Sequence, residues 1–348
     1  MFSSVTHILE QAIRQQAFPA AVVEVGDATR PLWRGAAGRL SYDADAHPAG
    51  GDTIFDLASL TKVLATAMFV MQQVERGVLG LDDRVGEHVA AWEGADRAHV
   101  TLRDLLAHSS GLAEYFPFYK DHAGRAEFER AICRAPLDYE PRTKSIYSDL
   151  GFMLLGFILE DEVPLPARFD ALRQQMALAE DLQFHPPSLW LPRTAPTEVD
   201  PWRGRLLVGE VHDENAAALG GAAGHAGLFG TAAAVGQYAR HLLQILDGKV
   251  GVVQRATLET FIARTDVPGS SRALGWDTML PSSSCGSLMS PRAFGHTGFT
   301  GTTLWIDPDR GVYVVLLTNR VHPSRTNDAI KQIRRAVHDA VMRELKGG

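Results

Sequence analysis

The stretch FDLASLTKVLATAMFVMQQV, residues 55–74, carries a single basic residue, Lys62, in a long apolar run. Its apolar positions recur at the spacing of one helix face and nearly surround the helix. The run therefore predicts a buried helix that ends before Gly77, because glycine commonly follows a helix C-terminus. A lysine in such a helix must be paired with an anion or lose part of its charge.

Ser59 precedes Lys62 by three residues, so the two side chains share one helix face and the amine can reach the hydroxyl. Two interpretations follow. In the first, Ser59 is a helix N-cap and Lys62 extends its ammonium to water. In the second, a lysine of depressed pKa activates a nucleophilic serine, and the N–H groups at the helix start hold an oxyanion. This stretch alone leaves both open.

Composition limits the function classes. The chain has 348 residues, of which 45% are hydrophobic, enough for about two domains or one large one. Its net charge of -7 and the lack of a long basic run argue against nucleic-acid binding. Cys133 and Cys285 are too few for a disulfide framework or a thiolate metal site, and no motif indicates a cofactor.

No apolar stretch reads as a membrane span, since the longest contains Lys62, and the N-terminal residues read as an amphipathic helix rather than a signal peptide. We therefore expect a cytoplasmic protein, or a periplasmic one if a leader has been removed. The sequence does not indicate an oligomeric state.

Strand signals concentrate at the two ends of the chain. AAVVEVGDATRPLWRGAAG, residues 20–38, predicts two strands around a turn at Gly26 and Asp27. GTTLWIDPDRGVYVVLLTNR, residues 301–320, predicts a hairpin, and residues 327–345 predict a closing helix.

Between these ends the sequence is mainly helical. Residues 100–112 and 148–161 predict short helices, and residues 160–210 predict irregular structure. We therefore expect an α/β (α+β) fold in which an antiparallel sheet, built from both chain ends, is flanked by helices. The sheet domain would comprise residues 1–80 and 216–348, residues 81–215 would form an inserted helical subdomain, and the active site would lie at their junction.

Two further motifs could carry chemistry. Tyr147-Ser148-Asp149 immediately precedes an apolar helix, where Asp149 could simply be the N-cap. GHTGFTG, residues 295–301, precedes a strand, where His296 could be incidental to a glycine-rich turn.

Three other segments have structural explanations. LGGAAGHAGLFG, residues 219–230, lacks the Gly-Lys-Ser/Thr ending of a phosphate loop and predicts close backbone packing. His212-Asp213-Glu214 predicts a solvated turn, because consecutive residues do not converge on one metal ion. His108 is expected to be structural.

Taken in order, Ser59-x-x-Lys62, Tyr147-x-Asp149 and His296-Thr297-Gly298 resemble the motifs of penicillin-recognising serine hydrolases. The similarity is to the class C β-lactamase-like branch, which includes D-alanyl-D-alanine carboxypeptidases and family VIII carboxylesterases. It covers nearly the whole chain, because LLAHSSGL, HDENAAALGGAAGHAGLFGT and LGWD also look like segments of that branch.

The resemblance implies a serine β-lactamase-like fold and a role for each motif. Ser59 would be acylated, and Lys62 would keep Tyr147 partly ionised as the general base. The backbone N–H groups of Ser59 and Phe299 would form the oxyanion hole. His296 would support Tyr147, and the remaining motif residues would contact a small ester, amide or β-lactam substrate: Asp149, Thr297 and Gly298.

Two residues depart from the pattern of the family. Asp149 stands where asparagine is usual, and His296 stands where β-lactamases usually carry lysine. Both changes would weaken the hold on a substrate carboxylate. They favour an esterase or amidase over a hydrolase of β-lactams or D-amino-acid peptides. A third hypothesis is a binding protein that keeps the fold without turnover.

Overall fold

The computed structural model describes residues 2–179 and 181–346. Its centre is a six-stranded antiparallel sheet in the order β2-β1-β11-β10-β9-β8. The strands are β1 (Ala20–Asp27), β2 (Pro31–Gly38), β8 (Asp277–Thr278), β9 (Phe294–Thr297), β10 (Thr303–Asp307) and β11 (Val312–Thr318). Since β1 pairs with β11, the two ends of the chain meet in one sheet, which confirms the predicted architecture.

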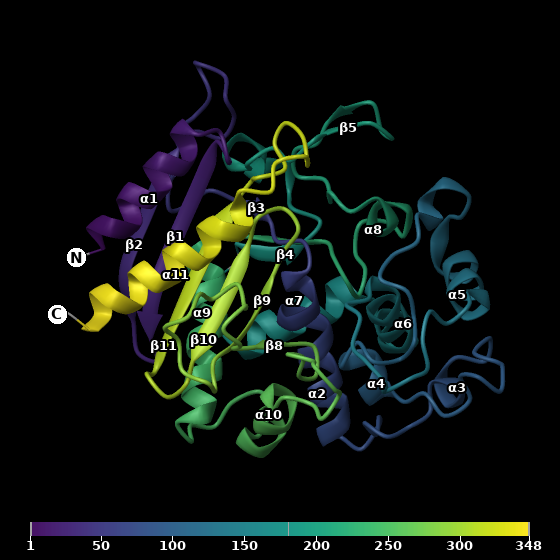
Figure 1. The fold of residues 1–348 in the computed structure, drawn as a ribbon. Helices are drawn as coiled ribbons and strands as arrows, with labels where there is room; N and C mark the ends of the chain where they lie inside the picture. Colours follow the sequence, from purple (N-terminus) through teal and green to yellow (C-terminus); the bar gives the residue numbers. More distant parts are fainter. Residues whose placement is uncertain (1, 180, 347–348) are drawn as a thin grey trace.

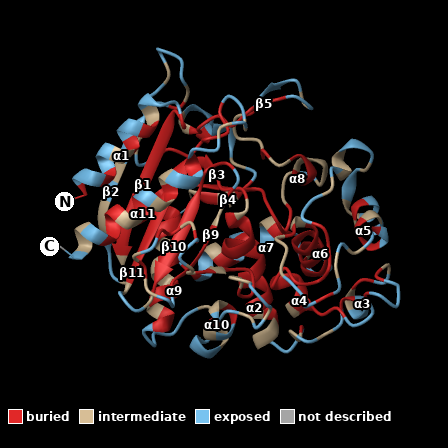
Figure 2. Cartoon of the chain, viewed as in Figure 1, coloured by how far each residue is buried: buried red, intermediate tan, exposed pale blue. Residues whose placement is uncertain are grey.

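Helices cover both faces of this sheet, so its inner strands are apolar on both sides. Helices α1 (Ser3–Arg14) and α11 (Ile330–Lys346) lie side by side on one face, and α9 (Ala232–Leu246) crosses the other (Figure 1). Side chains of β1 alternate between the two cores, with Val23 facing α1 and α11 and Val22 facing the opposite core. The inner strands β1, β10 and β11 are buried, whereas the outer faces of α1 and α11 are exposed (Figure 2).

The helix predicted after Ser59 has two parts. A π-helical turn, η1 (Lys62–Thr66), leads into α2 (Ala67–Glu75), and Gly77 follows in the left-handed region with φ of 69°. A π-turn admits one extra residue per turn and is common at functional sites. The irregular turn therefore begins at the residue of interest, Lys62.

The middle of the chain supplies the remaining helices, gathered at the end of the molecule away from the termini (Figure 1). They are α3 (Val85–His88), α4 (Leu102–Leu106), α5 (Gly124–Arg134), α6 (Asp149–Glu160) and α8 (Glu214–Ala218). Helix α7 (Leu165–Gln175) lies nearer the centre and contacts α6 and β4, while α10 (Arg255–Ile262) packs near α2 and α9. Short 3₁₀ turns span Phe118–Lys120 and Ser188–Arg193.

Two small sheets complete the fold. Strand β4 (Leu182–Phe184) and β3 (Phe55–Asp56) flank β7 (Leu228–Gly230), and β5 (Val199–Asp200) pairs with β6 (Arg205–Leu206). Because β4 pairs with a strand outside residues 81–215, the expected subdomain shares backbone hydrogen bonds with the rest of the chain.

Two local predictions are wrong. The first hairpin turns after Asp27 rather than at Gly26, because the Asp27 carboxylate accepts hydrogen bonds from the N–H groups of Thr29 and Arg30. Residues 165–175 are helical rather than irregular, because Leu165, Phe169 and Leu172 place one apolar face against the core.

The prediction of close packing in the glycine-rich segment is confirmed at Gly224. A Cβ atom at Gly224 would lie 2.1 Å from the carbonyl oxygen of Phe152 and 2.9 Å from the Cα of Gly156, both on α6. Real side chains do not approach so closely. The two glycines therefore allow the segment before β7 to lie directly on the backbone of α6.

We expect Gly224→Ala to lower the free energy of unfolding by about 1–3 kcal/mol, because the added methyl group must push α6 away. Gly51→Ala is the matched control, since a Cβ there meets nothing within 4 Å. Thermal and urea unfolding would measure both. Equal free energies of unfolding for the two variants would show that the close packing at Gly224 does not affect stability.

Candidate active site

Ser59 lies at the start of the helix that leads into η1, directly after a left-handed residue, Ala58, with φ of 47°. The turn is held by Asp56, whose buried carboxylate accepts from the N–H of Ala58 at 2.8 Å and from the N–H of His212 at 2.7 Å. A non-glycine residue in this region is strained unless its surroundings enforce it. The strain sits one residue before the candidate nucleophile.

Lys62 is completely buried, and its ammonium donates three hydrogen bonds. The acceptors are Ser59 Oγ at 3.0 Å, Asp149 Oδ1 at 2.7 Å and the carbonyl oxygen of His225 at 3.1 Å. Three is the full donor capacity of an ammonium group. The structure thus excludes the interpretation in which Lys62 extends to water.

The charge of Lys62 is stabilised rather than suppressed. Burial acts to lower the pKa of Lys62, but the nearby carboxylate of Asp149, together with the phenolate form of Tyr147, outweighs it and raises the pKa above its ordinary value. The hypothesis from the sequence that Lys62 has a depressed pKa is therefore wrong. The raised pKa favours the ammonium form of Lys62, which suits this residue to stabilise negative charge rather than to accept the serine proton.

Tyr147 and Asp149 lie at the N-terminus of α6, whose N-cap is Ser148 rather than Asp149. Asp149 begins the helix and points its carboxylate at Lys62, with which it forms an ion pair. The ring of Tyr147 lies 4.9 Å from Lys62 Nζ. The structure thus brings Ser59, Lys62, Tyr147 and Asp149 together, as the resemblance implied.

Two opposing effects set the pKa of the Tyr147 phenol. Burial raises the pKa of Tyr147, and the charge of Lys62 lowers it by less, so the net pKa is above its ordinary value. The charge of Lys62 thus acts in the direction expected from the sequence, toward the phenolate, and a partly ionised Tyr147 stays a prediction. The hydroxyl is buried near Lys62 and Ser59 yet makes no hydrogen bond of good geometry to any described residue.

His296 lies at the end of β9 and is 2% exposed. Its Nδ1 lies 2.8 Å from the carbonyl oxygen of Thr297, so Nδ1 carries the proton and Nε2 holds a lone pair. Burial, together with the positive charges of Arg272 and Lys62, holds the pKa of His296 well below its usual range. Its ring centroid lies 5.8 Å from that of Tyr147, so a neutral imidazole faces the phenol.

The N–H groups of Ser59 and Phe299, which are expected to form an oxyanion hole, belong to two segments that contact each other. Thr300 and Thr302 donate hydroxyl hydrogen bonds to the carbonyl oxygens of Asp56 and Leu57. A Cβ at Gly298 would lie 2.6 Å from the Leu57 carbonyl oxygen, so only glycine fits there. Within residues 2–179 and 181–346, neither the Ser59 N–H nor the Phe299 N–H donates to another residue.

The side chain of Phe299 lies on a cationic platform that the sequence did not indicate. Its ring is 49% exposed and stacks on His212, with the guanidinium of Arg320 at 4.3 Å and that of Arg325 at 5.9 Å. Arg320 Nε also donates to the Phe299 carbonyl oxygen at 2.7 Å. Together they fix the backbone that carries the Phe299 N–H.

The predicted solvated turn at residues 212–214 is wrong, because these side chains form a buried polar network. His212 pairs with Glu198 at 2.8 Å, and Arg325 bridges Glu198 and Glu214. Asp213 caps α8 and accepts from His225, the residue whose carbonyl oxygen binds Lys62. Each charge has a partner, which is why the segment can be buried.

Arg272 is a site residue that sequence reasoning missed. Its guanidinium lies 5.1 Å from the centroid of the Tyr147 ring, it is only partly buried, and it forms no ion pair with any residue the structure describes. Arg272 lies in the loop between α10 and β8, which has no motif that could have placed it. A free cation thus lies beside the phenol.

Among the described residues, no group of three or more histidine, cysteine or acidic side chains could hold a metal ion. Cys133 and Cys285 are buried and free. None of the described helices is long and apolar enough to cross a membrane.

Comparisons with known proteins agree with the motifs. A family model described as Beta-lactamase matches residues 5–338. A putative D-alanyl-D-alanine carboxypeptidase of Escherichia coli (strain K12) is 32% identical over 308 residues, 78% of this chain and 70% of the relative. An N-acetylmuramyl-L-alanine amidase of Bacillus subtilis (strain 168) is 33% identical over 309 residues, 78% of this chain and 68% of the relative.

Solved structures share the fold over almost the whole chain. EstCE1, described as a hydrolase with promiscuous acyltransferase activity, has a TM-score of 0.75 at 23% identity and covers 96% of this chain and 97% of its own. A penicillin-binding protein homologue from Caulobacter crescentus has a TM-score of 0.76 at 20% identity, covering 98% and 96%. This chain therefore belongs to the beta-lactamase family of penicillin-recognising serine hydrolases.

Proposed function

We propose that this protein is a serine hydrolase that cleaves a small ester or amide through an acyl-enzyme on Ser59. The observation that carries the proposal is the arrangement at Lys62, whose ammonium holds the Ser59 hydroxyl while the carboxylate of Asp149 balances its charge. A nucleophile, a fixed cation and an adjacent proton acceptor, Tyr147, are the components of covalent acyl transfer.

Acylation proceeds in the following way. The reactive form is the one in which Tyr147 has released its proton to solvent, a state that the charge of Lys62 favours. Ser59 Oγ then attacks the substrate carbonyl carbon and passes its proton to the phenolate oxygen of Tyr147. The carbonyl oxygen becomes an oxyanion that accepts from the N–H groups of Ser59 and Phe299. The tetrahedral intermediate collapses, and the leaving group departs with the proton held by Tyr147.

Deacylation repeats these steps with water. Tyr147 removes a proton from the water molecule, the resulting hydroxide attacks the acyl carbon, and Ser59 leaves as its alcohol with that proton. Lys62 keeps its proton throughout, because its three donor positions are occupied and Asp149 stabilises its charge.

An esterase or amidase remains the first candidate. Asp149 is a carboxylate paired with Lys62, so it offers no hydrogen-bond donor to a substrate carboxylate, as an asparagine would. The lowered pKa of His296 keeps its imidazole from serving as a cation there. Substrate contacts would come from Thr297, which is partly exposed at the end of β9, and from the Gly298 backbone. EstCE1, a hydrolase with promiscuous acyltransferase activity, shares this fold.

A second candidate is a hydrolase of carboxylate-bearing amides, such as β-lactams or D-amino-acid peptides. The observation that favours it is Arg272, a free guanidinium beside Tyr147 that could bind a carboxylate with two hydrogen bonds. Two relatives are named as a putative D-alanyl-D-alanine carboxypeptidase and an N-acetylmuramyl-L-alanine amidase. A cytoplasmic location stays a prediction from the sequence.

Ser59→Ala should remain folded and lose all acylation, because it removes the candidate nucleophile and one hydrogen bond from Lys62, a loss of about 1 kcal/mol. Intact-mass spectrometry after mixing with a fluorophosphonate, p-nitrophenyl butyrate or a penicillin would detect the adduct on the wild type alone. Ser110→Ala, at another buried serine, is the control and should still form the adduct. Adduct formation on Ser59→Ala at the wild-type rate would disprove the nucleophile.

The pH profile of kcat/KM should show no limb from His296 between about pH 6 and 8, because an imidazole of strongly lowered pKa stays neutral there. Any rise in kcat/KM that depends on deprotonation of this histidine should occur at lower pH. The profile of His296→Gln, scaled to the same maximum, should therefore overlay that of the wild type in this window. A wild-type limb near the ordinary histidine pKa that His296→Gln removes would show that the imidazolium form matters.

Arg272→Gln decides between the two candidate substrate classes. If the guanidinium binds a carboxylate, the variant should raise KM for a D-alanine-terminated peptide or a cephalosporin by about tenfold or more and leave KM for p-nitrophenyl butyrate unchanged. Arg255→Gln, which removes a surface cation on α10, is the control. Equal KM values of wild type and Arg272→Gln for the charged substrates would leave the neutral ester as the better assignment.

A further inference from the structure

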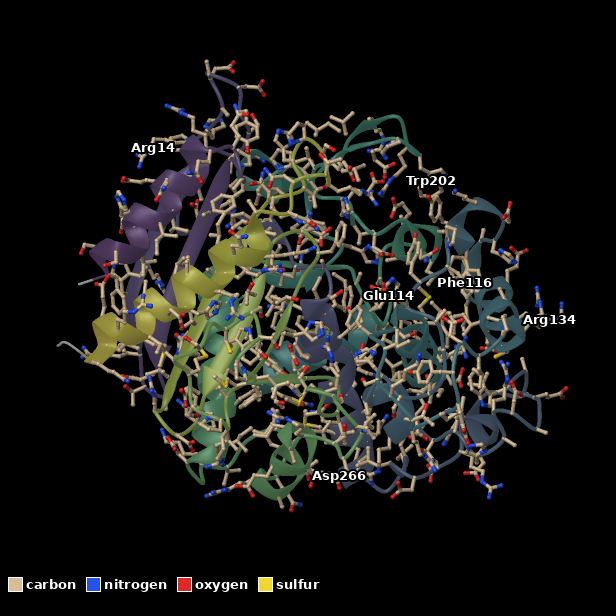
Figure 3. All side chains as sticks on the ribbon, in the orientation of Figure 1. Arg14, Glu114, Phe116, Arg134, Trp202 and Asp266 are labelled. Carbon is tan, nitrogen blue, oxygen red and sulfur yellow. The ribbon has the colours of Figure 1, made fainter. Side chains whose placement is uncertain are left out.

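Residues 145–149, which carry Tyr147, lie along residues 107–114, a segment that ends at Glu114, labelled in Figure 3. Five hydrogen bonds join the two segments. They run from Ser145 Oγ to the Ala107 carbonyl, from Ile146 N to the His108 carbonyl, from Ser148 N to His108 Nδ1, from Ser148 Oγ to the Ala113 carbonyl, and from Asp149 N to the Glu114 carbonyl.

One residue, His108, holds both neighbours of Tyr147. Its carbonyl oxygen accepts from the N–H of Ile146 at 3.0 Å, and its Nδ1 accepts from the N–H of Ser148 at 3.0 Å. Its ring also packs on the Tyr147 ring, with centroids 4.7 Å apart and planes tilted by 41°. The backbone on each side of Tyr147 and the ring itself are thus fixed by a single side chain and its own carbonyl group.

The conformation of His108 is one that few residues adopt. Its φ is 56°, in the left-handed region, and the residue is 1% exposed. The carbonyl oxygen is shared with the hydroxyl of Tyr139 at 2.9 Å, which helps to hold this conformation. Backbone strain of this kind persists only where the surroundings over-determine it, and it concentrates at functional sites.

The imidazole of His108 has a defined tautomer. Because a backbone N–H donates to Nδ1, the ring carries its proton on Nε2, and that atom is buried without a partner among the described residues. The charged or titratable groups that face the ring are Lys62, Arg272, His296 and Tyr147. Burial and the two cations hold the pKa of His108 well below its usual range, so Nδ1 stays an acceptor.

We propose that His108 is a positioning residue for Tyr147: its Nδ1 and carbonyl oxygen hold the backbone on both sides of the tyrosine, and its ring sets the orientation of the phenol toward Ser59. This inference rests on the proposed function, in which Tyr147 transfers the proton. It gives His108 a directed role in place of the merely structural one expected from the sequence. The same arrangement explains why a strained, buried histidine occupies this position.

The test compares two substitutions at the same site. His108→Phe keeps an aromatic ring but removes the acceptor at Nδ1, so we expect kcat for p-nitrophenyl butyrate to fall by about 10- to 100-fold with KM within about twofold of the wild type. His108→Asn offers an amide oxygen to the Ser148 N–H and tolerates the left-handed conformation, so it should retain most of kcat. Thermal melting would establish that both variants are folded.

His185→Phe is the matched control, because His185 also has a left-handed φ, 50°, but is exposed and has no side-chain hydrogen bond within the described ranges. It should keep the wild-type kcat. A folded His108→Phe enzyme with wild-type kcat, or a His108→Asn enzyme no more active than His108→Phe, would overturn the proposal.

A measurement on the wild type covers the case in which His108→Phe does not fold. The imidazole ¹⁵N shifts of His108, assigned by their absence from His108→Asn, should show a neutral ring protonated at Nε2 across about pH 6 to 8. A ring protonated at Nδ1 would overturn the proposal. Tyr147→Phe separates the two levels: an active Tyr147→Phe enzyme overturns the proposed function and this inference together, whereas an inactive one beside an unaffected His108→Phe overturns only this inference.

Discussion

The buried ammonium of Lys62 needs an anion, and no residue of its own helix provides one. The anion comes from Asp149, which lies at the first position of α6 and far away in the sequence. Moving an isolated charge out of water is so costly that the two segments must stay in contact for the chain to fold. Tyr147 is two residues from that carboxylate, so the ion pair that stabilises the core also delivers the phenol to the serine.

The residue that balances the charge of Lys62 is therefore a different one from the residue that could bind an anionic group of the substrate. In the sequence, Asp149 looks like a residue that faces the substrate, because its position matches one that usually carries an amide. In the structure its carboxylate pairs with Lys62, and the cation that lies beside the Tyr147 ring without an acidic partner among the described residues is Arg272. A site with an internal ion pair and an external cation has its charges fixed before substrate arrives, so little reorganisation accompanies the reaction.

The sequence predicted the parts of this molecule whose signals are local. The Ser59-x-x-Lys62 spacing, the terminal hairpin and the motifs at Tyr147 and His296 each depend on residues close in the chain, and the structure brings the motifs together. It could not predict the direction of the pKa shifts at Lys62 and Tyr147, since these depend on which groups gather after folding. Arg272 lies in a loop without a motif, and the double hold of His108 depends on a backbone conformation that sequence patterns do not encode.

The pairing of β1 with β11 has a kinetic consequence. Ala21 lies opposite Thr318, so nearly the whole chain must be present before the centre of the sheet can close. Such long-range pairing slows folding, because the entropy of closing a large loop is lost before the contacts are gained. A ribosome releases β1 early, and until β11 emerges the apolar edge of the β1–β2 ribbon stays unpaired and open to association with other chains.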